Sequence, residues 1–253
     1  MSENVDDARF EIMPGLVHVW DAVLSEGADN YPDFNGILDP TERRRAERFQ
    51  IEQHRIRFII CRGWLRLLLS AYTGRSPWDI ELVLNEYGKP KLAGNPVNTG
   101  LVFNLSHSAE RMVFAFAKDC MLGIDIEAYR NLTRPEGMVE RICCAREILN
   151  WQKRSADRRL QYFFSIWVRK EAIIKAQGQG ISLGMEHCEL SENLGRPVRL
   201  PESCGRAGEW TLLDLSFREP YWGAVAVNGL FKSLVRRDLP EKLLLQYLKC
   251  APG

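Results

Sequence analysis

The chain carries one pattern of predicted elements twice. The segment "GWLRLLLSAYTGRSPWDIELVLNEYGKPKL" predicts a helix ending at Gly74, then a strand and a tight turn at Gly88-Lys89-Pro90. The later segment "IWVRKEAIIKAQGQGISLGMEHCELSENLGRPVRL" predicts a helix ending near Gly178, then a strand and a second turn. Each turn precedes a pair of predicted strands, "LVFNLSHSAERMVFAFAKD" in the first copy and "WTLLDLSFREPYWGAVAVN" in the second. Matches in the same order at similar offsets predict two copies of one folding unit.

Each copy is predicted to be an α+β unit, in which a long helix packs on an antiparallel sheet of about three strands. The join between the copies falls around residues 119–121, which gives an N-terminal half of residues 1–119 and a C-terminal half of residues 120–253. A seam between two similar halves is a favoured place for a ligand cleft. We therefore expect the functional site where the halves meet.

Whole-chain properties favour a cytoplasmic protein. The formal net charge of +1 over 253 residues argues against non-specific nucleic-acid binding. No segment approaches the ~20 apolar residues that span a bilayer, and the acidic segment "MSENVDDARFEIM" does not resemble a signal peptide. The seven cysteines form no C-x-x-C pair, which favours reduced thiols. We expect neither nucleic acid nor a membrane as a partner.

Two carboxylates stand close together in an apolar stretch, "GIDIEAYR", at residues 123–130. Asp125 and Glu127 are two positions apart, so both side chains point to the same face of a strand. Like charges on one face repel each other and lower stability. By itself, this pair gives only a hint of a metal site.

A second pair of charges lies on the predicted helix "FFSIWVRKEAIIKAQGQGISL". Glu171 and Lys175 are four residues apart and share one helix face. Such a pair is ordinarily solvated, but the apolar circumference of this helix predicts burial. If Glu171 meets Asp125 and Glu127, three clustered carboxylates need a cation, and oxygen ligands beside a phosphate favour Mg²⁺.

Residues suited to phosphate binding precede these motifs. Ser106 and His107 follow a predicted strand in "FNLSHS", Lys89 lies in the turn "YGKPKL", and "HRIRFIICRGWLR" places several arginines on or near a helix. A lone histidine is more often a satisfied core or surface residue, and most such arginines are solvated. Each residue alone is therefore a weak signal.

Taken in order, "GKP", "FNLSHS", "GIDIE" and "WVRKEAIIKA" resemble the motifs of the 4′-phosphopantetheinyl transferases of the large, surfactin-synthetase-activating (Sfp) type. The motifs span about residues 88–183, and the arginine helix extends the likeness to about residue 40. The resemblance implies a pseudodimer of two similar α+β halves with the active site at their interface. It also implies a monomer, because the two halves already supply both sides of the cleft.

The resemblance assigns roles to the charged residues of the two motifs. Asp125, Glu127 and Glu171 match the family's magnesium-binding carboxylates, with Glu127 bound either directly or through water. Glu171 is also the expected general base, acting directly or through a metal-bound water. Lys175 would neutralise charge on the transferring phosphate or the leaving group, and His107 completes the expected catalytic set.

The same resemblance implies a set of contacts to coenzyme A. Arg57 aligns with a residue that holds the 3′-phosphate, and Arg48 is a second candidate for that task. Ser106 and His107 resemble phosphate contacts, and residues 88–90 resemble a nucleotide-binding turn. The full expected set is Arg48, Arg57, Gly88, Lys89, Pro90, Ser106, His107 and Lys175. One departure is Val168, where the family often has serine or threonine.

The implied reaction is attack of a carrier-protein serine on the β-phosphate of coenzyme A. It gives a phosphopantetheinylated carrier and adenosine 3′,5′-bisphosphate. The expected partners are acyl carrier and peptidyl carrier protein domains, which serve fatty-acid, polyketide or non-ribosomal peptide biosynthesis. Positioning and charge neutralisation supply most of the catalysis in such transfers.

A basic segment between the two acidic motifs is the expected dock for an acidic carrier. It runs from residue 131 to residue 164 and carries Arg134, Arg141, Arg146, Lys153, Arg154, Arg158 and Arg159. Apolar Met138, Val139, Ile142 and Leu149 would add buried contacts. An ordinary solvated face explains the charges equally well.

Two other functions fit parts of the pattern. A catalytically silent carrier- or nucleotide-binding module would keep the fold but lack a carboxylate or Lys175, and this sequence has them all. Another Mg²⁺-dependent nucleotide enzyme would more often show a glycine-rich phosphate loop, and the only candidate, "GQGIS", follows a helix instead of a strand. We therefore favour the transferase.

Overall fold

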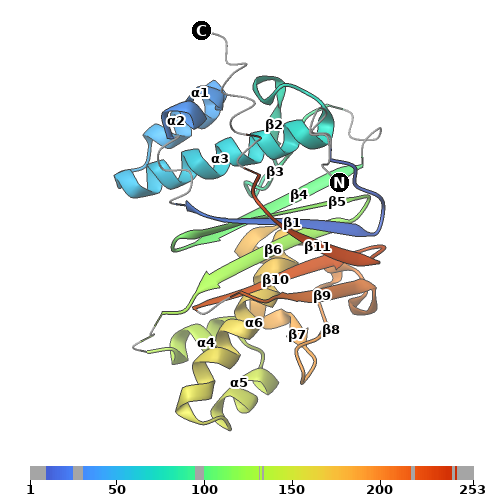
Figure 1. Ribbon diagram of the computed structural model, residues 1–253. Coiled ribbons are helices and arrows are strands. Elements are labelled where there is room, and N and C mark those ends of the chain that lie inside the picture. Colours follow the sequence, from blue (N-terminus) through green and yellow to red (C-terminus); the bar gives the residue numbers. More distant parts are fainter. Residues whose placement is uncertain are drawn as a thin grey trace, which may run out of the picture.

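Each of two sheets is covered by one long helix. α3 (Glu52–Thr73) packs on a four-stranded sheet, α6 (Ala156–Gln177) packs on a three-stranded sheet, and the sheets face each other between the helices (Figure 1). This computed structural model describes residues 10–24, 31–94, 100–130, 132, 134–217, 220–240 and 243. The fold is a mixed α+β architecture, as the sequence predicted. None of the helices in these ranges combines the length and apolarity needed to cross a bilayer.

The two sheets and their accessory elements are as follows. The first sheet has the spatial order β11 (Ser233–Asp238), β1 (Leu16–Val23), β5 (Arg111–Lys118) and β4 (Leu101–Ser108). The second has the order β6 (Met121–Ala128), β10 (Tyr221–Asn228) and β9 (Trp210–Leu215). Two small hairpins pair β2 (Leu82–Leu84) with β3 (Pro90–Leu92) and β7 (Glu189–Leu190) with β8 (Pro197–Arg199). The shorter helices are α1 (Tyr31–Ile37), α2 (Pro40–Glu47), α4 (Glu136–Ile142) and α5 (Ala145–Gln152), and one-turn 3₁₀ helices include Gly180–Leu183 and Met185–His187.

The repeated sequence pattern corresponds to repeated elements. α3 is capped by Gly74 with φ 69° and α6 by Gly178 with φ 87°, a left-handed conformation that favours glycine. The predicted helix ends are thus confirmed. A two-stranded hairpin follows each long helix, and the strand order β1-β5-β4 in the first sheet matches β6-β10-β9 in the second.

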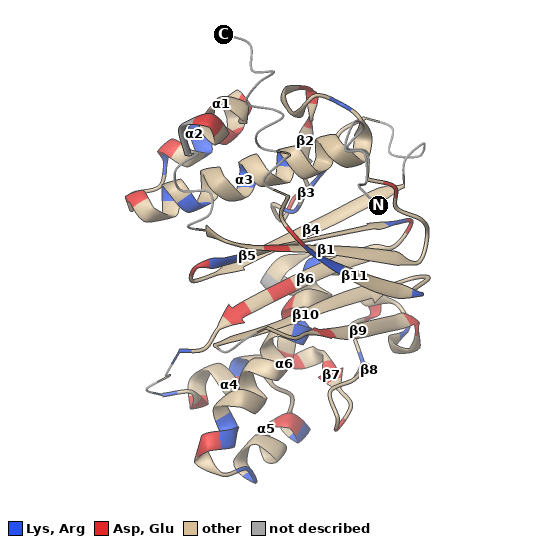
Figure 2. Ribbon diagram, viewed as in Figure 1, with Lys and Arg blue, Asp and Glu red and all other residues tan. Residues whose placement is uncertain are grey.

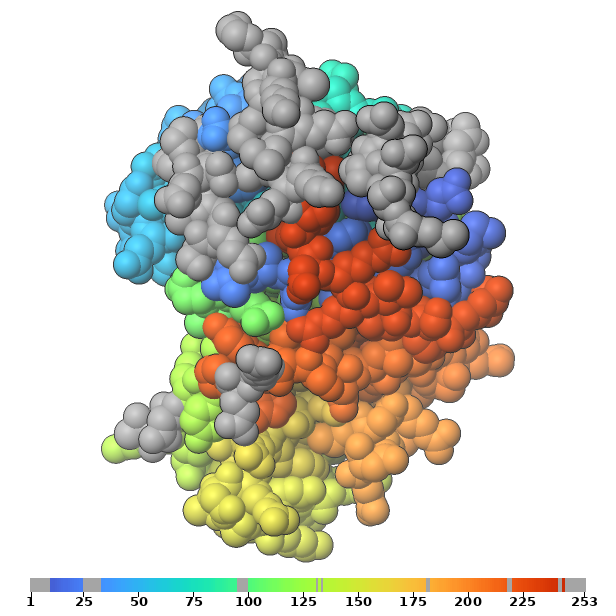
Figure 3. Space-filling model, viewed as in Figure 1, coloured from blue at the N-terminus to red at the C-terminus, as the bar shows by residue number. Residues whose placement is uncertain are grey.

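The first sheet differs from the predicted antiparallel sheet of about three strands. β11 lies parallel to β1, in a register that runs from Leu16 opposite Ser233 to Asp21 opposite Asp238. Figure 3 shows this C-terminal strand in red, on the surface between the blue N-terminal strand and the orange part of the chain. The side chains of β11 are mostly exposed, and its partner lies far away in the sequence. Its pairing therefore leaves no periodic pattern in "SLVRRD".

Small and branched apolar side chains join the two sheets. Val113 and Ala115 of β5 pack with Ile124 of β6 and Val225 of β10 in one core that is separate from the helix–sheet cores. Each fully buried side chain of this kind stabilises the fold by roughly 1.5–3 kcal/mol. This core fixes the seam along which the site lies.

A glycine brings β6 and α6 into contact. A Cβ on Gly123 would lie 1.9 Å from the Ala172 carbonyl oxygen and 2.5 Å from the Ala176 nitrogen. Any larger residue would push α6 away from β6. The close approach of Asp125 on the strand and Glu171 on the helix depends on this glycine.

Candidate active site

Three elements meet around Asp125. This carboxylate, only 3% exposed, accepts hydrogen bonds at Oδ1 from Lys175 Nζ at 2.6 Å and from Ser106 Oγ at 2.9 Å. Lys175 Nζ also donates to Ser106 Oγ at 2.8 Å. The predicted carboxylate, lysine and serine thus form one network, supplied by β6, α6 and β4. Figure 2 shows the acidic positions of β6 in red beside the seam.

A second serine orients the second carboxylate. Ser108 Oγ donates to Glu127 Oε2 at 2.9 Å and accepts the Ala128 N–H at 3.0 Å. The pairs Ser106–Asp125 and Ser108–Glu127 have the same offset of 19 residues, so β4 and β6 run side by side in the same direction here. Ser108 belongs to the motif "FNLSHS" that was expected to contact phosphate, but no role toward Glu127 was predicted for it, although its spacing from Ser106 equals the spacing of the two acids.

In the other two carboxylates, Glu127 and Glu171, the charged form is disfavoured by burial and by nearby negative charge. Burial raises the pKa of Glu127, and the negative charge of Asp125 raises it further. Burial also raises the pKa of Glu171, followed by the charges of Asp125 and, more weakly, Glu127. Lys175 opposes both shifts but is already engaged with Asp125. The three acids expected to act together therefore do influence one another, and a further positive charge would relieve their repulsion.

The oxygen atoms of this site suit a hard cation, but the residues that the structure describes do not by themselves complete the coordination of a metal ion. The second oxygen of Asp125, Oδ2, is buried and has no hydrogen-bond partner among the described residues. The donors nearby are carboxylate oxygens, which suit Mg²⁺ better than softer metals. Within the described part of the chain, no three His, Cys, Asp or Glu side chains are arranged as a ready-made metal site. Water and a phosphate oxygen would have to complete the coordination.

Positive and imidazole groups gather beside the carboxylates. The His107 ring is open to solvent on one side, yet the protein atoms packed around it lower its pKa to about 4, and the charges of Arg57, Lys175 and His54 contribute. Arg57 also lies 3.4 Å from Glu110 across an exposed ion pair. His107 and Arg57, both expected as coenzyme A contacts, thus lie in one neighbourhood. His54 was missed because a lone histidine on a helix carries no sequence signal.

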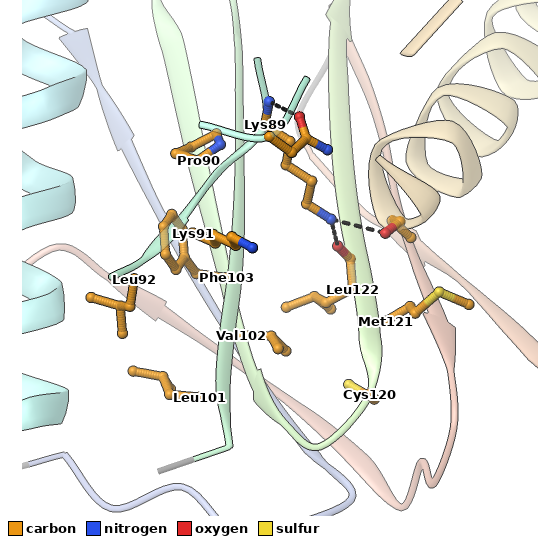
Figure 4. Close-up of a pocket in the computed structure, with 12 residues that line it drawn as sticks. Lys89, Pro90, Lys91, Leu92, Leu101, Val102, Phe103, Cys120, Met121 and Leu122 are labelled. Carbon is orange, nitrogen blue, oxygen red and sulfur yellow. Dashed lines mark hydrogen bonds between the residues drawn. The ribbon is translucent and has the colours of Figure 1, made fainter. Parts of the chain in front are cut away.

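The Lys89 ammonium lies between the start of β6 and the end of α6. Its Nζ donates to the Leu122 carbonyl at 3.1 Å and to the Ala176 carbonyl at 2.9 Å, and burial lowers its pKa to about 8 (Figure 4). Gly88 has φ 85°, which fits the predicted tight turn, and Pro90 begins β3. The structure therefore turns the Lys89 ammonium inward.

Arg48 lies apart from this network, just after α2. It is exposed and lines a pocket of about 560 Å³ with Thr41, Arg44 and Arg45. The guanidinium of Arg45 lies 5.4 Å from the centroid of the Phe58 ring. Phe58 directly follows Arg57 in the chain. A cationic surface thus extends from α2 towards the start of α3.

A groove of about 690 Å³ gives access to Glu171 from outside. It is lined by Arg141 and Ile142 of α4, by Trp167 and Glu171 of α6, and by Met185 of a one-turn 3₁₀ helix. Arg141 is exposed there, whereas Arg146 is held by Glu189 at 3.0 Å and by the Leu190 carbonyl. Of the two arginines, Arg141 is the one presented at the groove.

Comparisons with known proteins agree with this chemistry. A model of the 4′-phosphopantetheinyl transferase superfamily matches residues 121–226. The 4′-phosphopantetheinyl transferase HetI of Nostoc sp. is 33% identical over 213 residues, which are 84% of this chain and 88% of that protein. The 4′-phosphopantetheinyl transferase Sfp of Bacillus subtilis is 27% identical over 67% of this chain and 74% of its own length. AcpT of Escherichia coli K12, another 4′-phosphopantetheinyl transferase, is 31% identical over 54% of this chain and 74% of its own. The chain belongs to the 4′-phosphopantetheinyl transferase family and is an enzyme of that class.

Proposed function

We propose that this enzyme transfers the 4′-phosphopantetheine group of coenzyme A to a serine of apo acyl or peptidyl carrier proteins, in a reaction that depends on Mg²⁺. The observation that carries the proposal is the network of Asp125, Lys175 and Ser106, with the electrostatically coupled Glu127 and Glu171 beside it. The names of the relatives support the transferred group.

Asp125, Glu127 and Glu171 would hold the ion in this proposal. The buried, unpartnered Oδ2 of Asp125 is its best candidate ligand. When bound, Mg²⁺ would neutralise charge on the pyrophosphate of coenzyme A and relieve the repulsion among the acids. Ser108 fixes the orientation of Glu127, whichever way that carboxylate meets the ion.

Glu171 is proposed as the general base. Its place in the groove lets a carrier serine approach it, and a carboxylate there can accept the serine proton. The proton would pass to Glu171 directly or through one water as the serine oxygen attacks the β-phosphate. Adenosine 3′,5′-bisphosphate would leave.

Lys175, Ser106, His107 and Arg57 are proposed to position the phosphates. Lys175 lies within 3 Å of both Ser106 and Asp125, so its ammonium can exchange part of this network for a phosphate oxygen. The lowered pKa of His107 keeps its ring neutral near pH 7, able to donate one hydrogen bond. Arg57 and, further out, Arg48 would hold the 3′-phosphate, with the turn at residues 88–90 beside the nucleotide.

We extend the proposal to the organisation of the chain. The matched strand orders support a pseudodimer of halves 1–119 and 120–253. We also propose that the chain acts as a monomer, as the resemblance implies. The six cysteines that lie in the described ranges are all free thiols, in keeping with the expected cytoplasm. The carrier is proposed to dock along α4 and the groove, with Arg141 as a contact.

The proposal is tested by incubating the protein with coenzyme A, Mg²⁺ and an apo-carrier, and then weighing the intact carrier. We expect a gain of one phosphopantetheine that is lost when Mg²⁺ is replaced by EDTA. The Asp125→Ala variant should give no product under the same conditions. Absence of the adduct on a panel of acyl and peptidyl carriers would overturn the proposal.

A further inference from the structure

The C-terminal end of α6 is capped by a turn from the other half of the molecule. The last carbonyl groups of a helix have no partner within it. Lys89 Nζ donates to the Ala176 carbonyl at 2.9 Å, and Asn85 Nδ2 donates to the Gly178 carbonyl at 2.8 Å. Both donors come from the turn between β2 and β3, some ninety residues away in sequence, and Figure 4 shows the Lys89 side chain reaching from this turn.

The turn is prefolded for this task. Asn85 Oδ1 accepts the N–H groups of Tyr87 at 3.0 Å and Lys89 at 2.8 Å, and the Asn85 N–H donates to the Lys89 carbonyl at 2.9 Å. Gly88, with φ 85°, allows the chain to reverse. Asn85 therefore both shapes the turn and reaches the helix end.

Lys89 also binds the strand that carries the acids. The same ammonium donates to the Leu122 carbonyl of β6 at 3.1 Å. Ala176 directly follows Lys175, and Leu122 lies on β6 shortly before Asp125. A single side chain thus joins the backbone next to the active-site lysine to the strand of the active-site aspartate, which are themselves 2.6 Å apart at Nζ and Oδ1.

The space beside Lys89 is largely apolar, although Lys91 also lines it. A cavity of about 280 Å³ lies beside Lys89, lined largely by apolar residues such as Leu101, Phe103, Met121 and Leu122. If the ammonium were removed, two carbonyl groups would face this apolar space without a partner, which is unfavourable for buried acceptors. A positive charge at a helix C-terminus is in addition favoured by the helix dipole.

We propose that Lys89 and Asn85 are positioning residues, which fix the end of α6 against β6 and thereby hold Lys175 on Asp125. Lys89 does not bind the nucleotide through its ammonium. The effect on transfer rests on the proposed function, whereas the cap itself does not. This assignment differs from the nucleotide contact that the resemblance suggests for Lys89, and the two make opposite kinetic predictions.

The test compares Lys89→Met with wild type. Positioning predicts that kcat falls at least tenfold even at saturating coenzyme A, whatever change calorimetry shows in its Kd, because Lys175 is no longer held on Asp125. A nucleotide contact predicts the reverse: a Kd raised tenfold or more with kcat preserved at saturating coenzyme A. That reverse pattern, or no change in either quantity, would overturn the proposal.

Hydrogen exchange provides a readout that needs no activity. Lys89→Met and Asn85→Ala should both speed amide exchange in the last turn of α6, and Lys89→Arg should restore protection because a guanidinium can also donate to two carbonyls. Lys91→Met is the matched control, since Lys91 is an exposed lysine of β3 next to the turn; exchange and kcat should not change. Unchanged exchange in both Lys89→Met and Asn85→Ala would overturn the cap, even if Lys89→Met lost activity.

The experiment separates this inference from the proposed function. A wild-type enzyme that modifies no carrier would contradict the function, while faster exchange at the end of α6 in Lys89→Met would still support the cap. If Lys89→Met does not fold, Asn85→Ala and Lys89→Arg decide the question, because both keep a positive charge at position 89.

Discussion

The Lys175 ammonium lies 2.6 Å from Asp125 Oδ1, and the two residues come from different elements, α6 and β6. The lysine side chain is 28% exposed, whereas the aspartate side chain is 4% exposed. The ion pair is therefore partly open to solvent on the lysine side and faces the core on the aspartate side. An arriving phosphate can compete for the lysine, and the aspartate then needs another cation.

Lys175→Met should destabilise the metal-free protein. Asp125 would keep only Ser106 as a donor, so its buried charge would be poorly compensated. Losing a hydrogen bond to a charged group lowers the free energy of unfolding by about 1.5–3 kcal/mol. The measurement is urea unfolding at pH 7 in EDTA.

Lys153→Met is the control for Lys175→Met, because Lys153 is exposed after α5. Its unfolding midpoint should match that of wild type. An unchanged midpoint in Lys175→Met would show that this ion pair contributes nothing to the fold.

Glu171→Gln should stabilise the metal-free protein at neutral pH while removing activity. Burial, and then Asp125, raise the pKa of Glu171 in the folded state. The folded protein therefore binds this proton more readily than the unfolded chain, and stability is lost as pH rises from the ordinary glutamate value through the raised one. The neutral amide escapes that loss. Melting temperatures in EDTA between pH 4 and pH 8 should show a gap between variant and wild type that opens with rising pH.

The kinetic part of the Glu171 prediction is a fall in kcat of roughly 10²–10⁴, the usual effect of removing a general base. Glu140→Gln is the matched control, since Glu140 is exposed in the same groove. It should change neither the pH dependence of melting nor kcat. A Glu171→Gln variant that melts earlier than wild type at pH 8 would contradict the electrostatic argument.

Spacing alone allowed much of the site to be predicted. A separation of two places Asp125 and Glu127 on one face of a strand, and a separation of four places Glu171 and Lys175 on one face of a helix. The repeat placed that strand at the seam. The resemblance gave Lys89 a place at the nucleotide, and spacing cannot tell where a turn side chain points. In the structure its ammonium donates to backbone carbonyls of β6 and α6.

The parts that sequence did not indicate depend on contacts between distant segments. β11 has mostly exposed side chains, and its place beside β1 follows from backbone pairing alone. Ser108 acquires its role only because β4 runs alongside β6, which brings it to Glu127. His54 likewise matters only because α3 passes near His107.

Charge reversal should have different effects at Arg141 and Arg146, although the sequence gives no reason to distinguish the two arginines. Arg141→Glu should raise the KM for an acidic carrier about tenfold and leave the Kd of coenzyme A unchanged, because Arg141 is exposed at the groove. Arg146→Glu should instead lower the melting temperature, because Arg146 pairs with Glu189 and the Leu190 carbonyl. Steady-state kinetics with each substrate varied in turn, together with calorimetric melting, measure both effects. Equal losses for carrier and coenzyme A in Arg141→Glu would contradict a docking role.

A buried ion pair joins two segments that line the groove to α6. Lys170 is fully buried, and its Nζ donates to Glu147 at 2.5 Å and to the carbonyls of Ile142 at 2.8 Å and Met185 at 3.1 Å. Ile142 and Met185 both line the groove, and Lys170 immediately precedes Glu171. The ion pair therefore holds these two lining segments against α6, next to the proposed base.

Lys170→Met should lower the free energy of unfolding by about 3–5 kcal/mol, because it leaves Glu147 charged and buried without its cation. The double variant Lys170→Met/Glu147→Leu should recover most of that loss, since an apolar pair can replace a buried ion pair without large penalty. The two carbonyls would still lack their donor, so the two lining segments should be less fixed and the KM for the carrier should rise while the Kd of coenzyme A holds. Urea unfolding, calorimetry and carrier kinetics on both variants measure this. A double variant as unstable as Lys170→Met, or one with wild-type carrier KM, would show that the ion pair does not set the groove.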